Sequence, residues 1–231
     1  MPVGTVLIPG LACGPRLYTE QLPALWDFGP VTVADHTRDD SIPAIAQRVL
    51  DTAPPQFALA GLAMGGYIAL EIMRQQPERV ARLALLGTSA QPPGEKHFEH
   101  LTRMIALAES GHFAEVSSQV FPTIVHADRR HDQELRRAHA TMVAETGAEA
   151  YVRQVRANRG RIDSRPSLAA IACPTLVLVG DDDQKAPLAH AEELAEGIPD
   201  ARLVVVERCG HLSTMEQPAK VNEALSHWMS T

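Results

Sequence analysis

The chain has 231 residues, of which 45% are hydrophobic and 21% are charged, as is typical of one soluble globular domain. Its net charge is −7 and only 4% of its residues are aromatic, so we expect no general affinity for nucleic acid or for an anionic membrane. The sequence shows neither a signal peptide nor a membrane span, and its three cysteines lack the spacing of a metal site or a disulfide framework. These features predict a cytoplasmic protein without a metal site.

Short apolar runs alternate with amphipathic stretches along the chain, a pattern that favours a parallel sheet with helices on both faces. The apolar runs are continuous, as expected for strands that are covered on both sides. Six strands are predicted, at residues 3–8, 31–34, 57–61, 80–86, 175–180 and 202–206. Helical spacing of apolar residues predicts helices at 42–53, with Ser41 as a possible N-cap, at 188–198 and at 221–228.

The stretch from residue 91 to 166 interrupts this alternation, because it is bounded by prolines and contains no convincing strand. It carries 11 Lys and Arg against 10 acidic residues, whereas the rest of the chain has 10 against 18. We predict a helical cap, or lid, inserted between the fourth and fifth strands of a core made of residues 1–90 and 167–231. Three helical stripes support it: Leu101, Met104, Ile105 and Ala108; Leu135, Ala138, Met142 and Val143; and Tyr151, Val152 and Val155.

A glycine-spaced turn, GLAMG at residues 61–65, follows the third predicted strand and leads into an apolar helical run. A strand, a tight turn and a helix form the setting of a nucleophile elbow, Gly-x-Ser-x-Gly, but here Ala63 holds the central position. The glycines let strand and helix approach, so that the central side chain projects from the edge of the sheet. The backbone N–H of Met64 would then point toward a developing oxyanion. On its own, the turn could also be one that only packs.

Two later strands end in residues that suit triad chemistry. GDDD, residues 180–183, ends the fifth predicted strand, and His211 follows the sixth. Both lie on loops at the carboxyl ends of strands, where open α/β sheets bind ligands, and they follow the chain order nucleophile, acid, base. The loop after the first strand, PGLACG at residues 9–14, is where the second oxyanion donor is expected, and we assign it to the N–H of Leu11.

In this order the segments resemble the α/β-hydrolase superfamily, particularly its small esterase and lactonase-like branch with a helical cap. The segments that carry the resemblance are LIPGLACG, GLAMGG, CPTLVLVGDDDQKAP and ERCGHLSTMEQP. The resemblance implies that Asp183 is the triad acid, that His211 is the general base, and that Ala63 occupies the nucleophile's position. Asp181 and Asp182 are then turn and capping residues. It also implies an α/β-hydrolase fold with a six-stranded, mostly parallel sheet, because the two N-terminal strands usual in the family have no room.

Two departures from the family pattern bear on activity. The oxyanion loop reads Pro9-Gly10 where many relatives have His-Gly, which keeps the backbone donor but removes a side chain that often braces the loop. Ala63 lacks the nucleophile's hydroxyl, through either an engineered or isolated Ser-to-Ala inactivation or a natural loss of catalysis. We favour an inactivation, because a protein that had long lost catalysis would have no chemical reason to retain the acid, the base and the oxyanion loop.

The resemblance therefore predicts a serine hydrolase of carboxylic ester or lactone bonds with a Ser-His-Asp acyl-enzyme mechanism, present here in an inactive form. It requires no metal or organic cofactor, and the expected partner is a small-molecule ester or lactone bound by a monomer or homodimer. The alternatives are a natural non-catalytic ligand-binding protein and a carbon–carbon bond hydrolase or perhydrolase of the same fold. An Asp nucleophile, as in related dehalogenases and epoxide hydrolases, is disfavoured, because Ala is the usual silent replacement for Ser.

The cap is expected to roof the substrate pocket. We predict Cys13, Phe121 and Tyr151 as substrate-binding residues, with packing in the protein interior as the alternative role of each. The arginines of the cap could also bind an anionic substrate or an acyl carrier protein, although solvated faces and internal salt links are the default for such residues. These arginines are Arg129, Arg130, Arg136, Arg137, Arg153, Arg156, Arg159 and Arg161.

Overall fold

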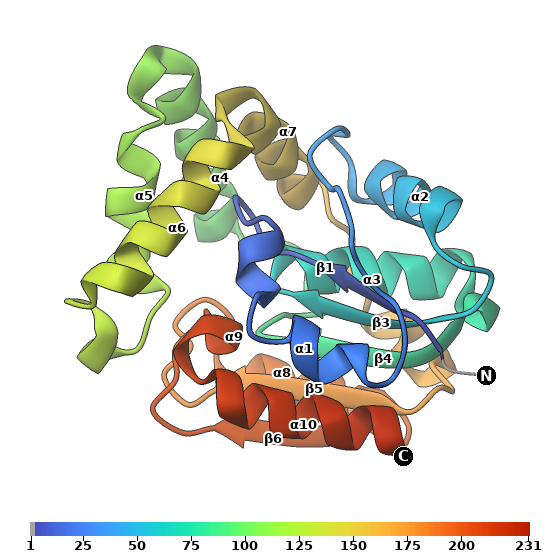
Figure 1. The fold of residues 1–231 in the computed structure, drawn as a ribbon. Helices are drawn as coiled ribbons and strands as arrows, with labels where there is room; N and C mark the ends of the chain where they lie inside the picture. Colours follow the sequence, from blue (N-terminus) through green and yellow to red (C-terminus); the bar gives the residue numbers. More distant parts are fainter. Residues whose placement is uncertain (1–2) are drawn as a thin grey trace.

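The computed structural model describes residues 3–231 and contains a six-stranded sheet (Figure 1). Its strands lie in the order β2-β1-β3-β4-β5-β6, and every neighbouring pair is parallel. The predicted sheet is confirmed, with the first strand starting two residues later, the second ending one residue earlier and the third ending one residue later than expected. The strands are β1 (Thr5–Ile8), β2 (Val31–Val33), β3 (Phe57–Leu62), β4 (Val80–Leu86), β5 (Thr175–Gly180) and β6 (Arg202–Val206).

Successive residues of the central strands point to opposite faces of the sheet, and both faces are buried. In β1, Val6 and Ile8 belong to one buried apolar cluster and Leu7 to the other. The same division separates Val177 from Leu178 in β5. Because helices cover both faces, neither side of these strands needs polar residues, which explains the continuous apolar runs in the sequence.

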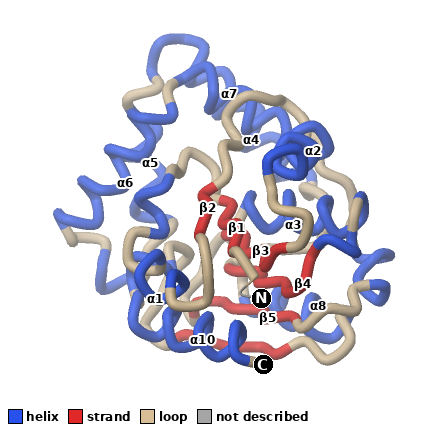
Figure 2. Tube along the Cα trace, turned by 45° about the vertical axis from the view of Figure 1, so that its right-hand side comes forward, coloured by secondary structure: helices blue, strands red, loops and turns tan. Residues whose placement is uncertain are grey.

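Two layers of helices cover the sheet. One face packs against α2 (Ile42–Thr52), α3 (Met64–Gln75) and α8 (Leu188–Gly197), and the other against α1 (Leu22–Trp26) and α10 (Pro218–Ser230). Figure 2 shows α2 and α3 on one side of the strands and α1 and α10 on the other. α2 begins after Ser41, whose hydroxyl accepts a hydrogen bond from the N–H of Ala44 at 3.4 Å, which confirms the predicted N-cap. Shorter turns of helix are Pro15–Tyr18, Pro77–Arg79, Arg165–Ala170 and α9 (Ser213–Glu216).

The segment 91–166, called the cap segment below, contains helices and no strand. Figure 1 shows its four longer helices grouped on one side of the molecule. Many of their apolar residues form a separate cluster, which also includes Ala12 from the loop after β1, whereas Leu135 and Met142 belong to a core cluster. Within residues 3–231, no helix is long and apolar enough to cross a membrane. The helices of the cap segment are α4 (Glu95–Leu107), Ala108–His112, α5 (Glu115–Val120), Phe121–Thr123, Ala127–Arg129, α6 (Gln133–Thr146) and α7 (Ala148–Arg159).

The connections of the sheet reverse direction between β1 and β3. From β1 the chain moves outward to β2 at one edge, and it then returns to β3 on the other side of β1. Ile8 at the end of β1 is paired in register with Gly61 near the end of β3. The loop after β1 and the turn after β3 therefore meet at the carboxyl edge of the sheet, where a reversal of strand order leaves a crevice that binds ligands in open α/β folds.

Candidate active site

Ala63 lies on the sharp turn between β3 and α3, with φ 53° and ψ −112°. A residue with a side chain in such a conformation costs roughly 1–3 kcal/mol, and it persists only where its surroundings impose it. The N–H of Ala63 donates to the carbonyl of Leu86 at 2.9 Å, and the hydroxyl of Thr88 donates to the carbonyl of Ala63 at 2.8 Å. The backbone therefore holds the conformation of a nucleophile elbow without a hydroxyl at its centre.

Gly61 and Gly65, on either side of Ala63, let backbone segments touch. A Cβ atom on Gly65 would lie under 3.0 Å from the carbonyl of Ile8, and one on Gly61 would lie equally close to the backbone of Gly65. Real Cβ atoms essentially never make such contacts, and neither backbone can move away without displacing a strand or a helix. The glycine spacing read from the sequence thus has a steric basis.

His211 and Asp183 form a hydrogen-bonded pair at the edge of the sheet. Nδ1 of His211 lies 2.8 Å from Oδ2 and 3.0 Å from Oδ1 of Asp183, and Oδ1 also accepts the N–H groups of Lys185 and Ala186. Burial disfavours the charged carboxylate, but the charge of His211 and these hydrogen bonds outweigh it and hold the pKa of Asp183 below its ordinary value. The carboxylate favours the imidazole tautomer protonated at Nδ1, which leaves Nε2 available as a base.

Neighbouring residues fix the loops that carry this pair. Gly87, at φ 48° after β4, lies so close that a Cβ atom there would be 2.9 Å from Oδ2 of Asp183. Asp181 accepts the N–H of Arg208 at 2.9 Å and so ties the loop after β5 to the loop after β6. Asp182 accepts the N–H of Ala127 at 3.2 Å. Both aspartates therefore connect loops that are distant in the chain, and neither side chain lines the cavity.

Leu11 and Met64 both line the same cavity as Ala63 and His211. Among residues 3–231, neither backbone N–H has a hydrogen-bond acceptor. Met64 is the first residue of α3, where the helix dipole adds a partial positive charge. Two N–H groups without acceptors at one cavity can bind a developing oxyanion.

A buried histidine and a buried glutamine brace the loop that carries Leu11. Nε2 of His36 lies 3.0 Å from the carbonyl oxygen of Gly10, and the N–H of Ala12 donates to Oε1 of Gln154 at 3.0 Å. Burial lowers the pKa of His36 despite its hydrogen bond to Gly10, which keeps the imidazole neutral at pH 7. Neither His36 nor Gln154 was predicted from the sequence, because both lie far from the loop in the chain.

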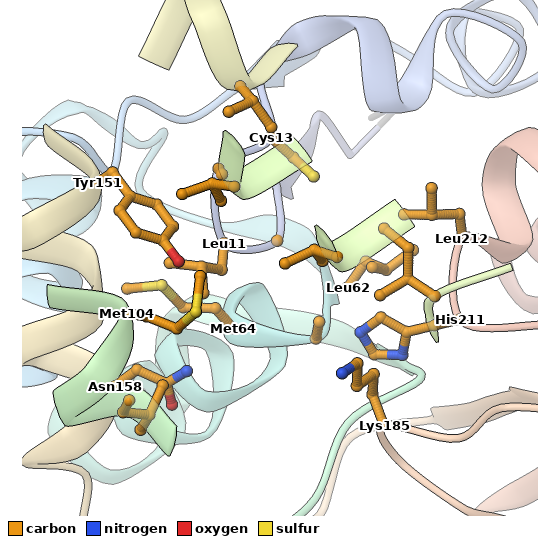
Figure 3. A pocket seen from close by; sticks show the side chains of 18 of the residues that line it. Leu11, Cys13, Leu62, Met64, Met104, Tyr151, Asn158, Lys185, His211 and Leu212 are labelled. Carbon is orange, nitrogen blue, oxygen red and sulfur yellow. The ribbon is translucent and has the colours of Figure 1, made fainter. Parts of the chain in front are cut away.

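The cavity has a volume of about 160 Å³ and lies between the core and the cap segment (Figure 3). Four of the five predicted catalytic and oxyanion residues line it. The fifth, Asp183, lies behind His211. Of the predicted substrate-binding residues, Cys13 and Tyr151 line the cavity, whereas Phe121 does not. Phe121 is fully buried and packs against His139, with ring centroids 5.9 Å apart.

Five polar residues at the cavity were missed in the sequence. Lys185 lies two positions after the triad acid, and this place in the loop was the one signal that could have identified it. The others come from helices of the cap segment, where helical spacing marks apolar residues only. They are His97, His100, His139 and Asn158.

Cys13 is a buried, unpaired thiol. Burial raises its pKa to about 12, so the thiol stays neutral at pH 7 and is a poor nucleophile. No group of three His, Cys, Asp or Glu side chains in the part of the chain that the structure describes is placed to hold a metal ion.

The order of turn, acid and histidine after three parallel strands defines an α/β hydrolase, and the chain belongs to the alpha/beta hydrolase family, whose model matches residues 5–224. A relative from Variovorax paradoxus, named as the carbamate hydrolase RutD, is 31% identical over 218 residues, which cover 92% of this chain and 78% of the relative. An esterase from Thermogutta terrifontis superposes with a TM-score of 0.89 at 26% identity, covering 99% of this chain and 89% of its own. The enol-lactonase of Burkholderia xenovorans LB400 has the same fold, with a TM-score of 0.90 at 23% identity and coverage of 100% and 92%.

Proposed function

We propose that this α/β hydrolase is a serine hydrolase of carboxylic ester or lactone bonds in which Ala63 takes the nucleophile's place. The observation that carries the proposal is one cavity that joins Ala63 on its elbow, the base of a hydrogen-bonded His211–Asp183 pair, and two N–H groups without acceptors. An acyl-transfer site needs a nucleophile, a base held by an acid, and an oxyanion site. All but the nucleophile are present.

The reaction follows from these positions once a hydroxyl is supplied by the Ala63→Ser substitution. His211 takes the hydroxyl proton through Nε2 while the oxygen attacks the substrate carbonyl, and the N–H groups of Leu11 and Met64 stabilise the oxyanion. His211 then protonates the departing alcohol. In the second half, His211 deprotonates a water molecule that attacks the acyl carbonyl, the bond to the serine oxygen breaks, and His211 returns the proton to that oxygen as the acid leaves. Asp183 keeps the imidazole oriented throughout.

With Ala63 the acyl-enzyme cannot form. Loss of a triad serine lowers turnover by roughly 10⁶-fold in a serine protease, while binding and the oxyanion site remain. Alanine differs from serine by a single oxygen atom, and the cavity walls do not depend on that atom. We therefore expect this chain to bind its substrate and to hydrolyse it very slowly.

The decisive experiment compares the Ala63→Ser variant with the chain as it is on short p-nitrophenyl esters, a small lactone and a small carbamate. The carbamate is included because the relative from Variovorax is named for that activity. We expect at least a 10³-fold rise in kcat/KM for one of these classes. The double variant Ala63→Ser/His211→Gln should lose the gain. A folded Ala63→Ser variant that is inactive on every class would refute the proposal.

A second candidate is a ligand-binding protein that uses the hydrolase cavity without chemistry. Ala63 itself favours it, because the cavity is formed although the nucleophile's position carries no hydroxyl. An inactive but ligand-binding Ala63→Ser variant would support this candidate. Carbon–carbon bond hydrolysis and perhydrolysis use the same groups, and they are tested by adding a vinylogous diketone, or hydrogen peroxide with acetate, to the assay of the same variant.

A further inference from the structure

The cavity wall carries nitrogen donors and no carboxylate. Lys185, His97, His100 and Asn158 line it, while none of the Asp and Glu residues in the described part of the chain does. The acid Asp183 is screened from the cavity by His211, to which it is hydrogen-bonded. A substrate that enters therefore meets one cationic side chain and several N–H donors.

Lys185 has no ion-pair partner of its own. Among residues 3–231 no carboxylate oxygen lies within 4.0 Å of its ammonium nitrogen. Asp183 is the carboxylate whose charge stabilises the ammonium, and both of its oxygens already accept hydrogen bonds. Partial burial lowers the pKa of Lys185, although the residue keeps an exposed surface. Its ammonium is therefore available to pair with an anion bound in the cavity.

Two histidines of α4 lie within the field of this lysine. The rings of His97 and His100 are 6.5 Å apart between centroids. Burial, together with the charges of Arg161, His100 and Lys185, lowers the pKa of His97 to about 4. His97, His100, Lys185 and Arg161 are thus close enough to act on one another electrostatically. At pH 7 the two neutral imidazoles can donate N–H groups to an acceptor.

Arg161 orients the fourth donor. Its guanidinium donates to Oδ1 of Asn158 at 2.7 Å, to the carbonyl of Gln91 at 3.1 Å, and stacks 4.4 Å above the ring of Tyr67. Because Oδ1 of Asn158 is taken, its amide nitrogen is the atom left for the cavity. Figure 3 shows this nitrogen and the Lys185 ammonium both pointing into the cavity.

We propose that the cavity contains a carboxylate subsite and that the substrate is a small ester or lactone bearing a carboxylate. Lys185 forms the ion pair, and His97 and Asn158 donate hydrogen bonds. The volume of about 160 Å³ suits a compact molecule, since a cavity of about 150 Å³ holds benzene. Naming the ligand a substrate rests on the proposed function, whereas its binding does not.

The test measures binding to the chain with Ala63 by isothermal titration calorimetry. The probes are monomethyl glutarate, which keeps one carboxylate, and dimethyl glutarate, which has none. We expect the half-ester to bind at least tenfold more tightly, as is usual for a charge-assisted pair. Lys185→Gln should remove this preference without changing the affinity for the diester, and Lys185→Arg should keep most of it.

The matched control is Lys220→Gln, which removes the same charge from α10, away from the cavity, and should leave both affinities unchanged. Thermal unfolding of each variant shows whether it is folded, and Lys185→Met replaces the Gln variant if that one is not. Equal affinity for the two probes, no binding of either, or an undiminished preference in the Lys185 variants overturns the subsite.

These outcomes are independent of the Ala63→Ser assay. An Ala63→Ser variant that hydrolyses neutral esters without preferring half-esters leaves the proposed function standing and removes the subsite. If half-ester binding depends on Lys185 but the Ala63→Ser variant is inert, the subsite stands and the proposed function is removed.

Discussion

The side-chain carbonyl of Gln154 accepts a hydrogen bond from the backbone N–H of Ala12 at 3.0 Å, although the two residues are 142 positions apart. Gln154 belongs to α7 of the cap segment, and Ala12 follows the proposed oxyanion donor Leu11. Ala12 has φ 57°, a conformation that a residue with a side chain adopts at a cost. The cap segment thus helps to hold the loop that carries Leu11.

Replacing Gln154 with Leu should weaken catalysis in the Ala63→Ser background. Leu has a similar volume but accepts no hydrogen bond, so the buried N–H of Ala12 loses its partner at a cost of about 1–3 kcal/mol. We expect kcat to fall about tenfold or more while KM changes little, because an oxyanion donor acts mainly in the transition state. Steady-state kinetics on the preferred ester measure both.

The control for this change is Gln119→Leu. Gln119 is exposed on α5 and its amide donates only to Glu115, so kcat should stay within twofold. An unchanged kcat in the Gln154→Leu variant would mean that the loop keeps its shape without this bond.

Gly65→Ala should destabilise the fold strongly. The added methyl group would collide with the backbone carbonyl of Ile8, and overpacking of this kind costs about 1–3 kcal/mol or more. Gly94→Ala is the matched control, since a Cβ atom there meets nothing within 4 Å and its φ is −66°. Urea unfolding of the two variants gives the comparison, and equal midpoints would contradict the close approach of α3 to β1.

Asp183→Asn in the Ala63→Ser background should lower kcat by roughly 10⁴-fold, the loss found for this change in a Ser-His-Asp triad. The Asn amide presents an N–H to Nδ1 of His211, which then carries its proton on Nε2 and cannot act as a base. Asp182→Asn is the control one residue away and should keep activity within threefold. A loss of similar size in both variants would show that the substitutions lower kcat by disturbing the loop and not by changing the tautomer of His211.

His139 should make the protein less stable in mild acid. Burial lowers its pKa to about 4, against 6.5 in the unfolded chain. Between these values the unfolded state binds more protons, so stability is full above pH 6.5, falls as the pH drops toward 4, and is constant below that as far as this group is concerned. The loss from His139 is about 3 kcal/mol.

The His139→Asn variant tests this, because Asn can still bond to Ser117, whose hydroxyl lies 2.9 Å from Nδ1 of His139. Urea unfolding at pH 7 and pH 4 should give a smaller difference for the variant than for the unchanged chain. His131→Asn, at an exposed position, should leave the difference unaltered. If both variants track the unchanged chain, His139 does not titrate as described.

The strands could be predicted closely because apolar runs covered on both sides differ sharply from their neighbours, and the elbow could be predicted because its glycines are fixed by steric contact. The ends of the first two strands were less certain: Val3 and Ala34 are apolar, but they lie beyond the last paired residues Thr5 and Val33. Local composition does not record where a partner strand stops.

The polar side of the cavity could not be predicted. His97 and Asn158 lie on helices whose spacing reports their apolar faces, and which polar residue reaches the cavity depends on how the helices pack over the core. Phe121 illustrates the same limit, since an aromatic residue in the cap segment could face the cavity or the interior, and it is fully buried in the interior. The division of the chain into core and cap, and the catalytic roles, stay predictions that the experiments above address.

The pairing of Ile8 with Gly61 has a consequence for design. The two candidate oxyanion donors follow adjacent parallel strands, whose separation of about 4.8 Å is a property of the backbone ladder. Their spacing therefore does not depend on the side chain at position 63. Serine, cysteine or aspartate could be installed at Ala63 in turn, and differences in rate among the three would report the nucleophile alone on an unaltered frame.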